Sequence, residues 1–475
     1  MKLAYSNRSA LLFKAKYYSA CLKDVDTCVA MGCPSEVLDK LRKRKEEANG
    51  FAFHEHLSKK FRETSLALSE KLIRPQSSSP HILGASRDVK VILESDGPKI
   101  VAARDIDIGT ILALETAYVS STHPDNNFFS CFYCHKMSLN LIPCDRCCYA
   151  LFCDESCQQK CMQENHNFMC PIIDNINKND PGSILAIQTL VKLRQTKSWN
   201  DIIAISSSIN GSGSSTVDGV ISNLISKENK YFVVGRVFNH SIQNAIIIHY
   251  LDTETDFFPS SHDERVDAIL AASNIIMNLS IYANVMMLSS SVAINCEQIG
   301  LSKTNIHNIP NYGLFSFIGK VKKSCHSNSS TVAMNKDLAL VAVMPIKKDT
   351  EITVTHLSGP WLEENLLNYC RPIKIFMTEN IICTCIICSG DWTRQTLNKS
   401  QAKKFNEIDK CALERECTPD DFFYMYKNIC GTMKALSDAP YSEEYAVVYS
   451  IFRKCILHFQ NAVADNSLVS LHKNN

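Results

Sequence analysis

Eight cysteine and histidine side chains lie within forty residues of one another. They are spaced as Cys-x2-Cys, Cys-x2-Cys, Cys-x3-Cys and His-x3-Cys, and they are Cys131, Cys134, Cys144, Cys147, Cys153, Cys157, His166 and Cys170. Thiolate and imidazole suit Zn²⁺, and a closed set of four such ligands makes a structural site. Two sets use all eight, so the spacing predicts two structural zinc ions. Because forty residues bury too little core alone, we expect metal binding to drive folding here.

A second group of cysteines follows much later in the chain. Cys383, Cys385 and Cys388 offer three ligands, and a fourth would have to come from another segment. Buried apolar thiols are the alternative interpretation for these three residues alone. Histidines at 54, 56, 240 and 249 are better explained as solvated or packed side chains than as ligands.

The composition narrows the classes of function. The chain has 475 residues, which favours two to four domains, and 50 Lys+Arg against 49 Asp+Glu leave a net charge of +1. That balance provides no whole-molecule attraction to nucleic acid or to an acidic membrane. Basic residues interrupt the first thirty positions, so no secretory signal is expected and the protein is predicted to be intracellular. In a reducing compartment, 22 cysteines indicate metal ligation and not a disulfide framework.

Helices are expected at both ends and strands around the cysteine cluster. Residues 1–34 predict two amphipathic helices that meet at Ala15-Lys16, resembling a tetratricopeptide repeat, with an ordinary helical hairpin as the alternative. Residues 74–88 are turn-rich and predict a linker. Expected strands are 89–94, 99–103, 110–115, 313–318, 330–334, 339–344 and 351–355; expected helices are 184–205, 217–227, 263–288 and the last hundred residues, with an exposed loop at 206–215. Polar residues inside 266–288 favour a buried helix over a membrane span.

The order of these motifs resembles a known family. Having the only histidine seventh among the eight ligands is similar to a MYND finger and unlike a RING finger. The finger follows the run VAARDIDIGTILALE at 101–115 and precedes the strand-rich region and the Cys-x-Cys-x2-Cys group, which is the order of SET and MYND domain-containing proteins. The N-terminal repeat resembles the fourth-member type of that family. The resemblance extends over nearly the whole chain.

The resemblance implies how the ligands are shared. In the finger, Cys131, Cys134, Cys153 and Cys157 would hold one ion, and Cys144, Cys147, His166 and Cys170 the other. Cys325 would join Cys383, Cys385 and Cys388 on a third zinc ion.

It also implies an α+β multidomain fold, a split SET β core interrupted by a MYND finger and a helical insertion, between helical ends. The expected parts are 1–73 tetratricopeptide-like helices, 74–88 linker, 89–130 first part of the SET domain, 131–170 MYND finger, 171–290 helical insertion, 291–356 second part of the SET domain, 357–390 post-SET zinc region and 391–475 C-terminal helices.

SET enzymes move a methyl group from S-adenosylmethionine to a lysine amine, and three of their motifs are altered in this chain. Lys322 and Lys323 stand where the family has the Asn-His pair that helps to hold the cofactor. His356 stands at the position of the tyrosine that orients the amine, and Gly97-Pro98-Lys99 keeps one glycine of the opening motif. A lysine about 4 Å from the sulfonium would repel it by about 4 kcal/mol at an effective dielectric constant of 20.

These departures predict a zinc-stabilised scaffold with a degenerate methyl-transfer site. The alternative is an active protein-lysine methyltransferase, in which carboxylates must balance the charges of Lys322 and Lys323. By the resemblance, the partners would be proteins or proline-containing peptides, including histones or corepressor components. No direct nucleic-acid or membrane partner is expected, and the family occurs in nucleus and cytoplasm.

Overall fold

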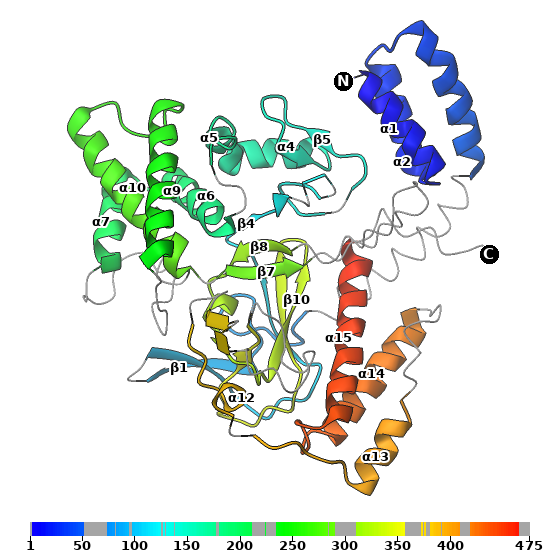
Figure 1. Cartoon of the computed structure of the whole chain (residues 1–475), viewed down its shortest axis with the longest axis vertical. Helices are drawn as coiled ribbons and strands as arrows, with labels where there is room; N and C mark the ends of the chain where they lie inside the picture. The colour runs from blue at the N-terminus through cyan, green and yellow to red at the C-terminus, as the bar shows by residue number, and fades with distance from the viewer. Residues whose placement is uncertain are drawn as a thin grey trace.

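The chain folds into helical bundles around a small β core (Figure 1). The computed structural model describes residues 2–51, 74–80, 82–94, 97–124, 127–128, 130–136, 138–176, 180–210, 224, 234–283, 285–289, 310–356, 372–373, 375–376, 381–390, 392–408 and 419–464. Most of the helix expected at 217–227, and residues 357–371 of the expected post-SET region, lie outside the described residues. Mixed helix and sheet agree with the predicted α+β class.

The N-terminal helices form a small bundle of their own. Helix α1 (Lys2–Lys14) packs on α2 (Tyr18–Ala30), and a further helix covers 35–51. The turn between α1 and α2 lies at the predicted place, where Lys16 has φ of 61°. The apolar residues shared by this bundle are Leu12, Ala15, Tyr17, Cys21, Val25, Cys28, Leu41 and Ala48.

The bundle is attached to the cysteine-rich region by a buried carboxylate. Arg8 donates to both oxygens of Asp24 at 2.6 and 2.7 Å and to Leu141 O at 3.1 Å. The side-chain amide of Asn140 donates to Asp24 Oδ1 at 2.7 Å and to Ala20 O at 2.9 Å. Because Asp24 is buried, these contacts supply the hydrogen bonds that it would otherwise lose to water.

The central sheet has five strands in the order β3-β11-β10-β12-β9. Their bounds are β3 Ile111–Thr116, β9 Lys322–Lys323, β10 Ser329–Met334, β11 Asp337–Ala342 and β12 Thr353–Val354. The pairs β3–β11 and β11–β10 are antiparallel, whereas β12 is parallel to both β10 and β9. Strand β12 is thus inserted between β10 and β9, which both precede it in sequence.

Three smaller sheets surround the central one. They are the hairpin β1 (Val89–Glu94) with β2 (Gly97–Ala102), the sheet β4 (Val119–Ser121), β8 (Pro310–Leu314) and β7 (Val285–Ser289), and the hairpin β5 (Ile142–Pro143) with β6 (Leu151–Phe152). Strand β2 also runs beside residues 349–352, since Ile352 N donates to Ile100 O at 2.8 Å. Figure 1 shows the β1 hairpin reaching outward from this core.

The segment 74–88 is more than the linker that its composition predicts. Ala85 bridges to Ala113 of β3 and is buried, and Ser86 N donates to Leu112 O at 2.8 Å. Gly84 has φ of 77°, and a Cβ there would lie 2.2 Å from Leu114 O. This close backbone approach needs glycine, so the turn-rich composition reflects an edge segment of the sheet.

The helical insertion differs from the prediction in three places. Its helices are α6 Pro181–Thr196, α7 Trp199–Asn210, α9 Val234–Thr253 and α10 His262–Tyr282. The single helix expected at 184–205 is broken, because Asp201 accepts from Ser198 N and Oγ and so starts a new helix. The expected loop is helical up to Asn210, and α10 ends at Tyr282 because 285–289 pairs with β8.

Strand β8 also ends earlier than the expected 313–318. The Glu115 carboxylate accepts from Ser316 N at 2.7 Å and from Ile318 N at 2.8 Å, and these bonds hold residues 316–318 in a turn. Glu115 belongs to β3, so it ties the two halves of the β core across the finger and the helical insertion.

The C-terminal part of the chain contributes four described helices, of which α15 (Glu443–Ala464) packs on β10 of the central sheet (Figure 1). They are α12 Ile386–Ser389, α13 Lys399–Asn406, α14 Pro419–Ala435 and α15 Glu443–Ala464. Asn398 and Gln401 form a capping box at α13, and Tyr445 Oη donates to Val343 O at 3.3 Å. Among the described helices, none has the length and apolarity needed to cross a bilayer.

Candidate metal centres and cofactor site

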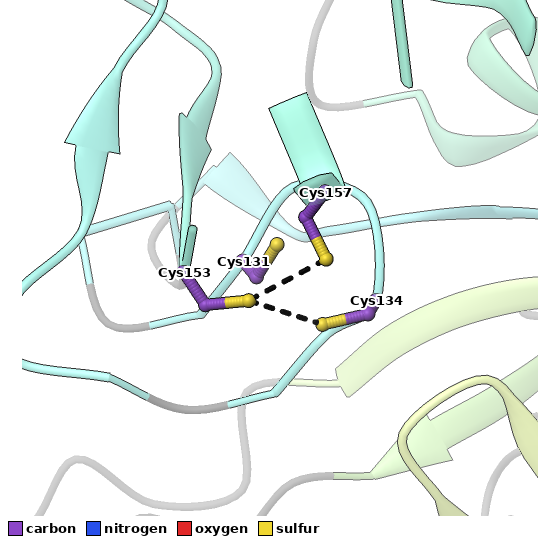
Figure 2. A group of neighbouring side chains, drawn as sticks. All are labelled: Cys131, Cys134, Cys153 and Cys157. Carbon is purple, nitrogen blue, oxygen red and sulfur yellow. Dashed lines mark hydrogen bonds between the residues drawn. The ribbon is translucent and has the colours of Figure 1, made fainter. Parts of the chain in front are cut away.

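The first cysteine group comprises Cys131, Cys134, Cys153 and Cys157, which Figure 2 shows converging from a turn, the end of β6 and helix α4 (Glu155–Cys161). The sulfur of Cys153 lies 3.7 Å from that of Cys134 and 3.5 Å from that of Cys157. Asp154 caps α4 by accepting from Cys157 N at 2.8 Å, which fixes the last ligand. Four sulfurs about 2.3 Å from a tetrahedral zinc ion would be roughly 3.8 Å apart, so this spacing fits zinc.

The second group comprises Cys144, Cys147, His166 and Cys170, all of them buried. The sulfurs of Cys144 and Cys170 are 3.9 Å apart, and Cys147 Sγ is 3.4 Å from His166 Nε2. His166 ends a π-helix at Met162–His166 (η2) and packs edge-on against Phe132 with ring centroids 5.5 Å apart. Burial lowers the pKa of His166 to about 4, so the imidazole is neutral and able to bind a metal at pH 7.

The third group draws its ligands from two distant segments. Cys325 lies between β9 and β10, and Cys383, Cys385 and Cys388 lie at and before α12. The sulfur of Cys325 is 3.4 Å from that of Cys388 and 4.0 Å from that of Cys383. The members of all three groups are those that the family resemblance implied.

In the first group, neighbouring thiols favour a thiolate at Cys131. The pKa of Cys131 falls to about 2, chiefly because Cys134 and then Cys153 donate hydrogen bonds to its sulfur. The same contacts raise the pKa of Cys153, since the donor must keep its proton. Four donors without a carboxylate or an open position suit a structural zinc ion in every group.

Strand pairing joins two of the three altered motifs. Thr353 pairs with Lys322 and Val354 with Lys323, so the Lys322-Lys323 pair lies beside the strand that precedes His356. Glu351 bridges to Val101 of β2. Gly97 and Pro98 instead pair with Glu94 and Leu93 at the turn end of the β1–β2 hairpin, so strand register does not bring them to the same place.

Lys322 has a carboxylate partner on the neighbouring segment. Lys322 Nζ lies 2.9 Å from Glu351 Oε2, with the lysine side chain 59% exposed and the glutamate 27% exposed. Lys99 pairs with Glu94 at 2.6 Å, and Lys323 is half-buried. The Lys322–Glu351 pair reduces the repulsion that Lys322 would exert on a sulfonium. The sequence analysis did not assign Glu351, because its partner is 29 positions away and only strand pairing joins them.

His356 lies against the third cysteine group. It is 2% exposed. The pKa of Cys383 is held well below its usual value by hydrogen bonds from Cys325, then Cys385 and Cys388, with His356 contributing to the same shift. The imidazole at the family's tyrosine position is therefore enclosed by protein and not open to solvent.

Comparison with known proteins gives matches over part of the chain. No family model matches it. It is 27% identical to protein-lysine N-methyltransferase SMYD4 of Danio rerio over 214 residues, 42% of this chain and 28% of that protein. It is 26% and 24% identical to the proteins of that name from Pongo abelii and Homo sapiens, over 36% of this chain and 29% of each relative. The chain therefore spans under a third of the length of these curated relatives, and the similarity supports a SET and MYND protein-lysine methyltransferase family.

Proposed function

From this support for a SET and MYND protein-lysine methyltransferase family, we propose that the chain is a zinc-stabilised protein-interaction scaffold with a degenerate methyl-transfer site. One zinc ion belongs to each of the three ligand groups. The finger and the N-terminal helices recruit proteins or proline-containing peptides, including histone or corepressor components, in nucleus and cytoplasm.

The surroundings of His356 carry this proposal. Its imidazole is buried beside Cys383 and lacks the phenolic hydroxyl that the resemblance assigns to orienting the substrate amine. Methyl transfer depends on positioning the amine and on the electrostatics around the sulfonium. A buried histidine at that position does not supply the hydroxyl.

The second candidate is an active protein-lysine methyltransferase, and the Lys322–Glu351 pair favours it. In this candidate, S-adenosylmethionine binds beside β2 and β9, with Lys322 neutralised by Glu351 at 2.9 Å.

Isothermal titration of S-adenosylmethionine into zinc-loaded protein separates the two candidates. We expect no binding by the unmodified chain and saturable binding by the Lys322→Asn/Lys323→His double variant. The matched control is Lys403→Asn/Lys404→His, which changes an exposed lysine pair on α13 and should resemble the unmodified chain. Saturable binding by the unmodified chain would support the enzyme candidate, and methylation of a lysine peptide would then establish it.

A further inference from the structure

One half-buried lysine of the central sheet packs against the finger. Lys336 lies in the turn between β10 and β11, after Asn335, which has φ of 56°. Its Nζ lies 3.5 Å from the ring centroid of Tyr133, next to the ligand Cys134. Its carbonyl oxygen accepts from Ala117 N at 2.9 Å, so the turn is anchored to the chain that follows β3.

The groups that face Lys336 are mostly negative or able to become so. Glu164, Cys161 and Cys134 favour its charged form, while burial lowers the pKa of Lys336 and the nearby Lys192 acts in the same direction. Glu164 also accepts the hydroxyl hydrogen of Tyr133, so the ring that Lys336 covers is itself oriented by that carboxylate.

The carbonyls beside Glu164 are satisfied by the helical insertion. Gln195 of α6 donates to Gln163 O and Glu164 O, both at 2.6 Å, across the π-helix. The finger, the insertion and the central sheet therefore meet at this carboxylate. A lysine is tolerated there although burying an unpaired ammonium is costly.

The first cysteine group gives a reason for a half-buried cation at this place. Four thiolates around Zn²⁺ carry a net charge of −2, and the sulfurs are partly shielded from water. A cation held at a fixed place beside such a centre stabilises the loaded form and disfavours the protonated, metal-free thiols.

We infer that Lys336 is a positioning residue that balances the charge of the zinc centre at Cys131, Cys134, Cys153 and Cys157, and thereby couples zinc retention in the finger to the β10–β11 turn of the central sheet. This inference rests on the zinc content that the proposed function assigns to that group.

Zinc release from the full-length protein tests this role. Lys336→Met keeps a long apolar side chain over Tyr133 and removes the charge. We expect it to lose one of three zinc ions to a chromophoric chelator about 10- to 100-fold more readily than the unmodified chain. The other two ions should leave at the unmodified rate, which also shows that the variant is folded. Hydrogen exchange should rise at residues 131–136 and not at 144–150.

Three further variants separate charge from packing. Lys336→Arg should retain zinc, and Lys404→Met, an exposed lysine change on α13, should have no effect. Glu164→Gln keeps an acceptor for Tyr133 but removes a negative charge, so zinc should be held as tightly as before or more tightly. Unchanged release from Lys336→Met, or equal losses in Lys336→Met and Lys336→Arg, would overturn the inference. An unmodified chain that binds fewer than three zinc ions would instead contradict the proposed function.

Discussion

Asn328 holds β12 between its two parallel neighbours through both ends of its side-chain amide. Nδ2 donates to Glu351 O at 2.8 Å, and Oδ1 accepts from Thr353 N at 2.9 Å. The residue lies three positions after Cys325 in the segment that also carries Lys322. This side chain therefore ties that segment to β12.

Asn328→Ala should weaken β12 locally. Removing the amide leaves a backbone donor and an acceptor of the inserted strand without partners, at a cost of about 2 kcal/mol. We expect the opening free energy of the Thr353 amide, measured by native-state hydrogen exchange, to fall by that amount. Asn49→Ala, an exposed change on helix 35–51, should alter this value by less than about 0.5 kcal/mol. Unchanged exchange at Thr353 in Asn328→Ala would contradict the role of this amide.

At the scale of single residues, the sequence identifies the metal ligands but does not show which distant residues pair with one another. Paired spacings identify Cys131 to Cys170 as ligands because few other uses place so many thiols together. The division of the eight finger ligands into two groups of four comes from the family resemblance, since spacing alone allows other divisions. The Lys322–Glu351 pair depends on long-range strand pairing, which local sequence does not encode.

Among the elements, the attachment of α1 and α2 to the finger depends on one buried carboxylate. Breaking a buried pair leaves an uncompensated charge, so Arg8→Met should destabilise this attachment by about 3 kcal/mol. The readout is faster hydrogen exchange in α1, α2 and residues 139–141. Lys45→Met breaks the exposed pair with Asp26, 2.5 Å apart, and is the matched control with an expected effect below about 1 kcal/mol. Equal effects of the two changes would argue against a buried anchor.

Element type was easier to predict than element ends. The turn at Ala15-Lys16 and the strand 89–94 match the structure because turn residues and apolar alternation act locally. The apolar run 263–288 looked like one helix, yet its end becomes β7 because β8, twenty residues further on, offers a hydrogen-bonding edge. Likewise, β8 ends early because Glu115, on the distant strand β3, accepts a hydrogen bond from Ser316 N.

Across the whole molecule, the third cysteine group joins the central sheet to the segment that leads into the C-terminal helices. Cys325→Ser should remove one of the three zinc ions, because it removes one of the four ligands of the third group. Cys325 lies 58 positions before Cys383, so this group joins two distant segments. We expect hydrogen exchange to increase at 381–390 and in the part of α15 that packs on β10, while the finger keeps its protection. Cys148→Ser, an exposed change outside every ligand group, should keep three zinc ions by elemental analysis. Loss of finger zinc in Cys325→Ser would show that the three groups are not independent.

The insertion of β12 between β10 and β9 also sets an order of events during protein synthesis. When the ribosome has translated residues 322–342, the slot between these two strands has no occupant, because residues 353–354 have not yet emerged. The nascent sheet then has two unpaired inner edges, which are prone to pair with other chains. The slot must remain open until β12 enters it, and Cys325 meets its remaining ligands only after residue 388 has left the exit tunnel. The ligand set of this group is therefore complete only after β12 has been synthesised.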